Sequence, residues 1–438
     1  MRYSIHIFFF LTAVMLLTAS CQFRKDDYVD FSAIEQAQNL DFRVMSQRET
    51  DLSDGLPADC YLPEQANAEA EKQVVPRQTT STTGVNILQQ MLKWGNQNRV
   101  TEIVGTYSSD DLSTGEQIRL SGKVMLPAGR RPKRLILVSH YTICSNAEAP
   151  SNCFSLEGIL VKLGYGLIIP DYLGYGVTAD KIHPYLVMNQ TAINVLDMFL
   201  SVRTWLKAVD RAPEEDDIYL MGYSQGAANT MAVLYWVESF FNDPDDEFYI
   251  PVHRVFVGGG PYDIKSTYEN YVNTDHTDYP VAVPLVLQGM ILGNNLSVTL
   301  TDMMQGWLCS NLDQWINSKQ YTSAQINDLI DTHVTHKMLT EEAMQQTSEK
   351  VAELYKAMTM NSIISYNWTP QSSVYMMHSI DDETVSYLNA INARSKWRNA
   401  NITYNFGHYG GHVRTALRFI YTVQTLLQDE EKEMQKYE

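Results

Sequence analysis

The strongest constraint on how this chain can fold is a short motif, Gly-Tyr-Ser-Gln-Gly, at residues 222–226. An apolar run at residues 218–221 leads straight into it, and residues 227–240 continue with the pattern of a helix. Glycines two residues before and after Ser224 let a strand and a helix approach each other closely at a sharp turn. The motif therefore predicts a strand–turn–helix unit that raises Ser224 above the end of a buried strand.

Short apolar runs alternate with helical segments through the middle of the chain. Such runs are typical of strands buried on both faces of a parallel sheet, and their alternation with helices predicts an α/β fold with right-handed crossovers. Before them, two alternating stretches at residues 101–107 and 117–126 predict an antiparallel pair of strands. The apolar runs are residues 135–138, 166–169, 218–221 and 255–257, and the helical segments are 194–208 and 227–240.

The strand pattern is interrupted over residues 262–368, where the sequence is helical and rich in methionine. It resumes with an apolar run at residues 374–377. We therefore predict a core formed by residues 99–261 and 369–438, with residues 262–368 inserted as a helical cap over an active site. Residues 21–98 are predicted to form an N-terminal arm that is polar and irregular apart from one short helix.

Four loop segments carry a family resemblance. They are residues 139–152, Pro-Asp-Tyr-Leu-Gly-Tyr-Gly at 170–176, the serine motif at 222–226, and Gly-Pro-Tyr-Asp at 260–263. Together they resemble segments of secretory lipases in the α/β-hydrolase superfamily, and the resemblance extends over residues 107–427. It implies the α/β-hydrolase fold, in which a mostly parallel central sheet is flanked by helices, and a serine nucleophile that cleaves esters.

A serine hydroxyl becomes a good nucleophile only when a base removes its proton and a carboxylate orients that base. In the α/β-hydrolase fold these groups follow in the order serine, acid, histidine. Residues 378–385, His-Ser-Ile-Asp-Asp-Glu-Thr-Val, resemble a frequent hydrolase pattern that places the acid at Asp382. Ser379 and Ser386 depart from that pattern, which leaves Asp381 as an alternative.

Two histidines are candidates for the base. The sequence Gly-His-Tyr-Gly-Gly-His-Val occupies residues 407–413, just before the last predicted helix. The family places its base in such a loop, often after a glycine, which favours His412 and leaves His408 as the alternative. The two glycines between these histidines argue against a helical pair of metal ligands. We predict a catalytic triad of Ser224, Asp382 and His412, with no metal and no cofactor.

The negatively charged oxygen of the reaction intermediate needs backbone N–H donors, which form an oxyanion hole. The first donor is expected at Gln225, where the helix after the serine begins. The second is expected in the loop after the third strand, at Tyr141, which stands where many hydrolases have glycine; Thr142 is its alternative. His140 is interpreted as a structural residue that braces this loop.

The first twenty residues predict an export signal that is not part of the fold. Arg2 precedes an apolar run at residues 5–17 that is short for a membrane span, and small residues then lead to Cys21. This pattern resembles a bacterial lipobox, so we expect residues 1–20 to be removed and Cys21 to carry a lipid anchor. The protein would then be attached to the cell envelope, at the outer membrane or the cell surface. The alternative is an ordinary secretory signal with an incidental cysteine.

Four further cysteines follow Cys21. Export would place them in an oxidising compartment, where disulfides form. Their closeness in sequence favours a Cys144–Cys153 pair, which makes Cys60–Cys309 the second pair, and buried free thiols are the alternative. Their spacing does not fit a zinc site.

The chain carries a formal net charge of −18. Nucleic-acid binding depends on Lys and Arg displacing phosphate counterions, so this acidic excess argues against a nucleic-acid partner.

The predicted reaction is cleavage of a carboxylic ester through an acyl-enzyme on Ser224. The substrate would be a small-molecule, lipid or carbohydrate ester, and the apolar stretch at residues 281–292 of the cap is compatible with an acyl chain. A serine exopeptidase of the same fold is an alternative, and it would bind a free amine with Glu341, Glu342 or Asp328. A catalytically inactive, surface-binding lipoprotein is the third hypothesis.

Overall fold

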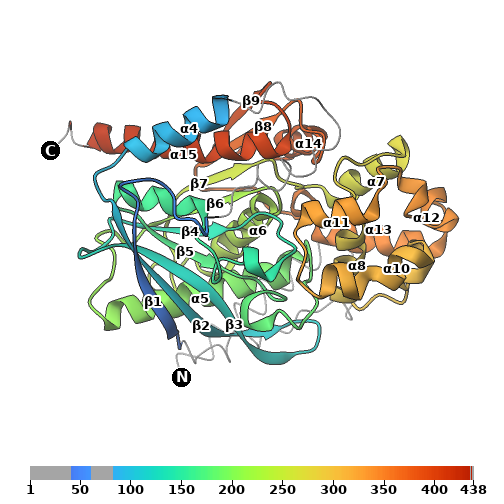
Figure 1. Ribbon diagram of the computed structural model, residues 1–438, viewed down its shortest axis with the longest axis horizontal. Helices are drawn as coiled ribbons and strands as arrows, with labels where there is room; N and C mark the ends of the chain where they lie inside the picture. The colour runs from blue at the N-terminus through green and yellow to red at the C-terminus, as the bar shows by residue number, and fades with distance from the viewer. Residues whose placement is uncertain (1–40, 61–81, 435, 437–438) are drawn as a thin grey trace.

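One mixed sheet organises the molecule (Figure 1). The computed structural model describes residues 41–60, 82–434 and 436, and within them nine strands follow the order β1-β2-β3-β5-β4-β6-β7-β8-β9. The strands are β1 (Arg43–Asp51), β2 (Arg99–Asp111), β3 (Glu116–Pro127), β4 (Leu135–Ser139), β5 (Gly166–Pro170), β6 (Ile218–Tyr223), β7 (Val252–Gly258), β8 (Val374–Ser379) and β9 (Ile402–Gly407).

The direction of the strands divides this sheet into two parts. Strands β1, β2, β3 and β5 pair antiparallel, whereas every pairing from β5 through β4 to β9 is parallel. All residues of β4, β5, β6 and β8 are buried, as expected for continuous apolar strands covered on both faces. The predicted fold class, a mostly parallel sheet flanked by helices, is confirmed.

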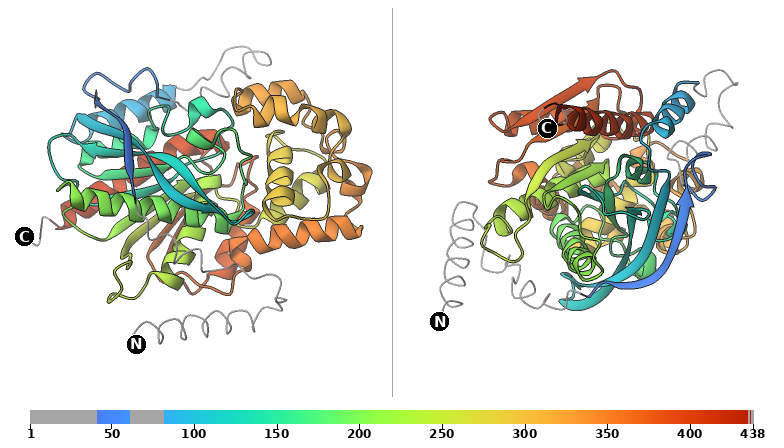
Figure 2. Two further views of the ribbon diagram at one scale, coloured as in Figure 1. Left: turned by 90° about the horizontal axis from the view of Figure 1, so that it is seen from below. Right: turned by 90° about the vertical axis from the view of Figure 1, so that its left-hand side faces the viewer.

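Helices cover both faces of the sheet (Figures 1 and 2). On one face lie α5 (Met188–Ala208), α6 (Gln225–Phe240) and α14 (Leu388–Lys396), whose apolar side chains share one core cluster. On the other face lie α4 (Thr82–Lys93), the 3-10 helix η2 (Leu156–Leu163) and the long C-terminal helix α15 (His412–Met434), which share a second cluster. The short turns η1 (Asn146–Glu148) and η3 (Gly176–Thr178) lie in the loops that follow β4 and β5.

Strand β1 was not expected from the sequence, which looked irregular over these residues. It pairs with β2 from Arg43 opposite Thr106 to Asp51 opposite Arg99, and it forms one edge of the sheet. Almost every β1 residue is exposed, so the sequence lacks the apolar alternation that marks a half-buried strand. Strand β1 is therefore defined by its backbone hydrogen bonds to β2, which its side-chain pattern does not reveal.

Between β7 and β8 the chain forms a series of helices, which we call the cap (residues 262–368). The cap lies at one end of the sheet domain in two perpendicular views (Figures 1 and 2). Its helices are α7 (Ile264–Thr274), α8 (Ala282–Gly293), α9 (Leu300–Met303), α10 (Gly306–Leu312), the π-helical turn η4 (Asp313–Asn317), α11 (Ser323–Ile330), η5 (Thr335–Lys337), α12 (Glu341–Gln345), α13 (Glu349–Asn361) and η6 (Ile363–Ser365).

The cap contacts loops that leave the carboxyl ends of the parallel strands. The N–H of Asn146, in the loop after β4, donates to the carbonyl of Lys319 at 2.8 Å. The hydroxyl of Tyr271 in α7 donates to the carbonyl of Thr384, in the loop after β8, at 3.0 Å. In open α/β sheets this carboxyl edge is where ligands bind.

The predicted disulfides are wrong. Among the described residues no disulfide forms, and Cys60, Cys144, Cys153 and Cys309 are all thiols. The thiol of Cys153 points to the carbonyl of Glu148 at 3.4 Å, within its own loop. Cys60 lies in the sheet domain, where it forms a β-bridge with Phe154, whereas Cys309 lies in helix α10 of the cap. The fold therefore places the members of the second predicted pair in different parts of the molecule.

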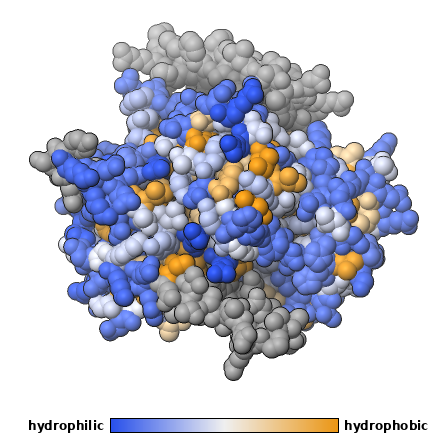
Figure 3. All heavy atoms as spheres, turned by 90° about the horizontal axis from the view of Figure 1, so that it is seen from above, coloured by the Kyte–Doolittle hydropathy of each residue, from blue (hydrophilic) through white to orange (hydrophobic). Residues whose placement is uncertain are grey.

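The face of the molecule seen from above is mostly polar (Figure 3). Figure 3 shows a mostly hydrophilic face with a small group of hydrophobic residues near its centre. Within the described residues, no helix is both long enough and apolar enough to span a bilayer. The lipidation site predicted at Cys21 lies outside the described residues.

Candidate active site

Ser224 occupies a strained turn between β6 and α6. Its backbone has φ 56° and ψ −125°, which side chains other than glycine rarely adopt. A Cβ atom on Gly222 would lie 2.1 Å from the carbonyl oxygen of Gly226, and one on Gly226 would lie 2.0 Å from that of Ser139. Both glycines are therefore required by close backbone contacts, and they let the turn present Ser224 at the carboxyl end of β6.

Three side chains from distant parts of the sequence form a continuous chain of hydrogen bonds. The hydroxyl of Ser224 donates to Nε2 of His412 at 2.8 Å. Nδ1–H of the same ring donates to Oδ2 of Asp382 at 2.7 Å. All three residues are buried, and they come from the turn after β6, the start of α15 and the loop after β8. This is the geometry in which a serine is activated by a histidine that a carboxylate orients.

Asp382 stays ionised at the centre of this network although its side chain is fully buried. Burial alone would raise its pKa, but the charge of His412 and its hydrogen bond hold the pKa of Asp382 below its usual value. Its second oxygen, Oδ1, accepts from the N–H of Val385 at 2.8 Å and from that of Thr384 at 3.1 Å. The carboxylate is thus fixed by three donors, and it would lose these hydrogen bonds if it rotated away from the imidazole.

The two alternatives that the sequence left open form a pair of their own. Nδ1 of His408 lies 2.7 Å from Oδ1 of Asp381. Both side chains are exposed, by 73% for the histidine and 42% for the aspartate. The structure therefore brings Asp382 and His412 to Ser224, and it places Asp381 and His408 together at the surface.

His412 is held from behind by two groups. The hydroxyl of Tyr223 donates to the carbonyl of His412 at 2.6 Å. The hydroxyl of Ser379 donates to the carbonyl of Gly410 at 2.6 Å, and so ties the histidine loop to the end of β8. Ser379 stands where the hydrolase pattern has glycine, and this hydrogen bond gives the departure a structural role.

The side chain of Gln225 has a partner that the sequence did not reveal. Its amide lies 2.8 Å from Nε2 of His183, whose Nδ1–H donates to the carbonyl of Leu173 at 2.8 Å. Burial, followed by the positive charge of Lys319, lowers the pKa of His183 to about 3. The ring is therefore neutral, and its Nε2 accepts from Gln225, the first residue of α6. No local motif marked His183, because its partners are brought to it only by folding.

The loop after β4, which carries Tyr141, is braced by a second histidine. The ring of His140 stacks on that of Tyr172 with their centroids 3.9 Å apart, and the Tyr172 hydroxyl donates to the His140 carbonyl at 3.1 Å. Asp171 adds a further brace by accepting from the N–H of Ser151 at 2.8 Å. These contacts agree with the interpretation of His140 as a structural residue.

With the fold and this geometry in hand, comparison with known proteins assigns a family. The family model for secretory lipases matches residues 150–420, which is more than half of the chain. The chain belongs to the secretory lipase family. As a member of this family it is a hydrolase of ester bonds, so the resemblance seen in the sequence is confirmed. A search of curated protein sequences returns no match.

Solved structures with the same fold include two enzymes. An esterase that degrades rice cell walls, LipA from Xanthomonas oryzae, superposes with a TM-score of 0.66 at 18% identity, covering 89% of this chain and 98% of that one. Candida antarctica lipase A superposes with a TM-score of 0.55 at 16% identity, covering 80% and 79%. At sequence identities this low, the structural similarity shows that this member of the secretory lipase family has the same fold as both enzymes.

Proposed function

We propose that this protein is a serine esterase that forms an acyl-enzyme on Ser224. The observation that carries the proposal is the buried chain of hydrogen bonds from Ser224 through His412 to Asp382, with lengths of 2.8 and 2.7 Å. It lies at the carboxyl edge of the sheet, where the cap contacts the strand-end loops.

In the proposed mechanism, Oγ of Ser224 attacks the ester carbonyl carbon while Nε2 of His412 takes its proton. Asp382 stabilises the imidazolium that forms, and the backbone N–H groups of Gln225 and Tyr141 bind the oxyanion. The imidazolium then protonates the departing alcohol. Water attacks the acyl-enzyme with His412 again acting as base, and the carboxylic acid is released.

The proposed substrate class is a carboxylic ester. The apolar residues of the cap do not indicate how long its acyl chain is. The apolar residues of α8 are buried in the core of the cap, as are Met303 and Met304. Their packing explains their apolar character, so they do not by themselves indicate an acyl-binding surface. One fold neighbour is a lipase and another a cell wall degrading esterase, which keeps both lipid esters and polymer-linked esters as candidates.

The alternative function, a serine exopeptidase, needs carboxylates that are free to bind the substrate's amine. Two of the carboxylates that the sequence offers for this role have other partners. Glu341 is exposed and accepts from Gln345 at 3.1 Å. Glu342 lies 3.7 Å from the ammonium group of Lys350. Both groups thus already have partners within the cap, and the family assignment favours an ester over a peptide.

The deciding experiment uses protein that lacks residues 1–21, assayed on p-nitrophenyl esters of increasing chain length. Ser224→Ala should lower kcat by roughly 10⁵- to 10⁶-fold, as expected when an activated serine is removed. The exposed cap residue Ser310 offers a matched control, and Ser310→Ala should keep wild-type rates. Ester hydrolysis that survives in Ser224→Ala would overturn the proposal, and activity on aminoacyl-nitroanilides alone would favour the exopeptidase.

We also propose that the protein is exported and anchored through a lipid on Cys21. The description of the family as secretory favours export. Cells fed an alkyne fatty acid should label the wild-type chain and not Cys21→Ser, whereas equal labelling of both would contradict the anchor.

A further inference from the structure

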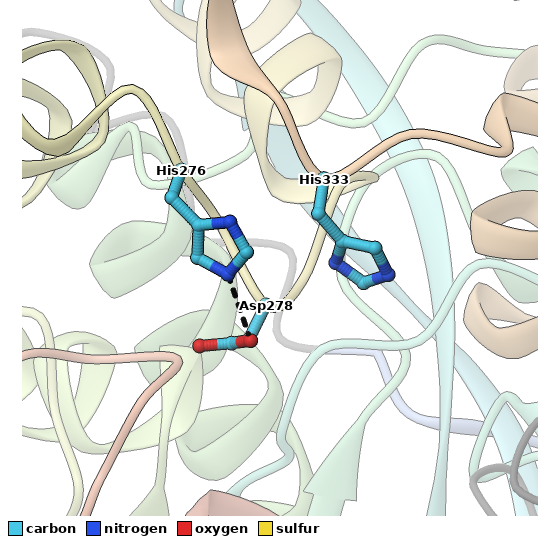
Figure 4. A group of neighbouring side chains, drawn as sticks. All are labelled: His276, Asp278 and His333. Carbon is cyan, nitrogen blue, oxygen red and sulfur yellow. Dashed lines mark hydrogen bonds and ion pairs between the residues drawn. The ribbon is translucent and has the colours of Figure 1, made fainter. Parts of the chain in front are cut away.

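Three side chains of types that can bind a metal ion gather on the cap, and none of them belongs to the Ser224 network. His276 and Asp278 lie in the segment between α7 and α8, and His333 lies between α11 and η5. One ligand atom from each residue lies within 4.8 Å of those of the other two. Figure 4 shows Asp278 below the two imidazole rings, with a dashed line joining it to His276. His333 is far in sequence from His276 and Asp278, so the three residues formed no recognisable metal motif.

The geometry of the three side chains suits a shared ligand. Nε2 of His276 lies 3.1 Å from Oδ1 of Asp278. The rings of His276 and His333 are stacked, with centroids 5.8 Å apart and an interplanar angle of 23°. In Figure 4 the near nitrogen of His333 faces the space between the other two side chains. Small rotations of the exposed side chains would bring all three ligand atoms to one ion.

The backbone that carries these residues is held in register. His276 and Val334 form an antiparallel β-bridge, and the N–H of Thr277 donates to the carbonyl of His333 at 3.0 Å. Nδ1–H of His333 now donates to the carbonyl of Thr277 at 2.9 Å, a hydrogen bond that a metal ion on this nitrogen would replace, whereas the β-bridge would remain. Thr277 and Thr335 are almost completely buried, so the two segments are anchored beneath the exposed ligands. The fold therefore pre-organises the cluster, which reduces the entropy cost of binding.

A neighbouring histidine–aspartate pair is a separate feature. Nδ1 of His336 lies 2.5 Å from Oδ2 of Asp275, and the backbone N–H of His336 donates to Oδ1 of the same carboxylate at 2.8 Å. Both carboxylate oxygens of Asp275 thus bind His336. We therefore do not include Asp275 or His336 among the candidate metal ligands, which are His276, Asp278 and His333.

The donor set selects the class of ion. Two imidazole nitrogens and one carboxylate oxygen are typical ligands of Zn²⁺ and related divalent transition metals, whereas Ca²⁺ and Mg²⁺ prefer sites made of oxygen. Three protein ligands leave room for water at the remaining position of a tetrahedral ion. All three residues are exposed, so water and metal have direct access.

We propose that His276, Asp278 and His333 bind one divalent transition-metal cation, for which Zn²⁺ fits best, with water completing its coordination. The ion would replace the hydrogen bonds that His276 and His333 now make, and each neutral ring would carry its proton on the nitrogen that faces solvent. Bound there, it would cross-link the segments on either side of the β-bridge and stiffen this part of the cap.

The three candidate ligands lie close in the chain to a helix that contacts the loop carrying Asp382. Tyr271, in the helix that precedes His276, donates to the carbonyl of Thr384, two residues after Asp382. Burial and then the charge of Asp382 raise the pKa of Glu383 in the same loop, and the charge of Asp278 adds a smaller contribution. A cation on the cluster would therefore reduce the negative charge that faces this loop.

The test uses tag-free protein that lacks residues 1–21 and has been stripped with a chelator. Zinc chloride titrated into it in a calorimeter should show one site per chain, and Co²⁺ should give the visible absorption bands of a tetrahedral nitrogen–oxygen site. His333→Ala and Asp278→Asn should each weaken binding by at least about a hundredfold, because each removes a direct ligand. Zn²⁺ should raise Tm in the wild type and not in these variants.

Two controls keep the result decisive. His408→Ala removes an exposed histidine that is hydrogen-bonded to an aspartate elsewhere, and it should bind Zn²⁺ as the wild type does. The metal-free Tm of Asp278→Asn should match that of the wild type, which separates a lost ligand from a lost fold. Absence of binding at micromolar Zn²⁺, or binding that both ligand variants retain, would overturn the proposal.

Discussion

Two histidine–aspartate pairs occupy the same two loops of this protein, one turned inward and the other outward. His412 and Asp382 are 2.7 Å apart, and so are His408 and Asp381. The inner pair is almost fully buried, with side chains 9% and 0% exposed, whereas the outer pair is 73% and 42% exposed. In the inner pair, His412 also accepts a hydrogen bond from the hydroxyl of Ser224.

This difference shows that the distance between a base and its acid does not by itself make a catalytic site. An exposed pair contributes about 0–1 kcal/mol, because water screens its charges and both side chains remain mobile. A buried pair keeps its geometry, and its charges interact more strongly in the lower dielectric. The predictions below test whether activity follows the inner pair alone.

The largest contrast is expected between the two histidines. His412→Ala removes the base and should lower kcat for ester hydrolysis by roughly 10⁵- to 10⁶-fold. His408→Ala should change kcat by less than about threefold, because its side chain does not contact Ser224 or Asp382. Steady-state kinetics on a p-nitrophenyl ester measure both, and a large loss in His408→Ala would show that the outer pair takes part in catalysis.

The two aspartates should repeat this contrast with a somewhat smaller effect. Asp382→Asn keeps the shape of the side chain but no longer stabilises the imidazolium, so kcat should fall by about 10⁴-fold. Asp381→Asn should leave kcat near that of the wild type. Equal losses in the two variants would mean that the loop, and not the individual carboxylate, is what matters.

A more moderate effect is expected at His183, which acts on the site through Gln225. His183→Phe fills the space but offers no acceptor, so the first residue of α6 should shift and kcat should fall by about 10- to 100-fold. KM should change much less, and His183→Gln, which can accept the same hydrogen bond, should recover part of the loss. The exposed residue His253 provides a control in His253→Phe. If His183→Phe lowered the thermal stability but left kcat unchanged, His183 would have only a structural role.

The smallest effect concerns a buried charge in the cap and its dependence on pH. Burial lowers the pKa of Lys319 to about 8, and its ammonium group lies 4.8 Å from the centre of the Tyr175 ring. The unfolded chain keeps this proton up to the ordinary lysine pKa near 10.4, so the free energy of unfolding should rise with pH from about 8 to 10.4.

Lys319→Met removes the cost of burying the charge and also the cation–π contact. The variant should therefore be more stable than the wild type by roughly 1 kcal/mol at pH 7, and the difference should shrink near pH 10. Urea denaturation at the two pH values measures this. Lys337→Met, at an exposed position of the cap, should show no such trend, and a Lys319→Met variant that is less stable at pH 7 would contradict the argument.

Much of the fold was predictable because its signals are local. The continuous apolar runs of β4 to β8 and the helical periodicity between them indicated the parallel sheet. The edge strand β1 was missed because its side chains are exposed, and the predicted disulfides were wrong because spacing in sequence says little about distance in space. Similarly, His276 and His333 come together only through a β-bridge between two parts of the cap.

The sequence by itself determined the turn at Ser224, because only glycines tolerate the backbone contacts at positions 222 and 226. It also narrowed the acid and the base to two candidates each, and their catalytic roles stay predictions until the variants are measured. Which candidates meet Ser224 was decided only by the tertiary structure. Burial and a hydrogen bond to a third, distant residue are properties of the packed molecule, and no local pattern of residues encodes them.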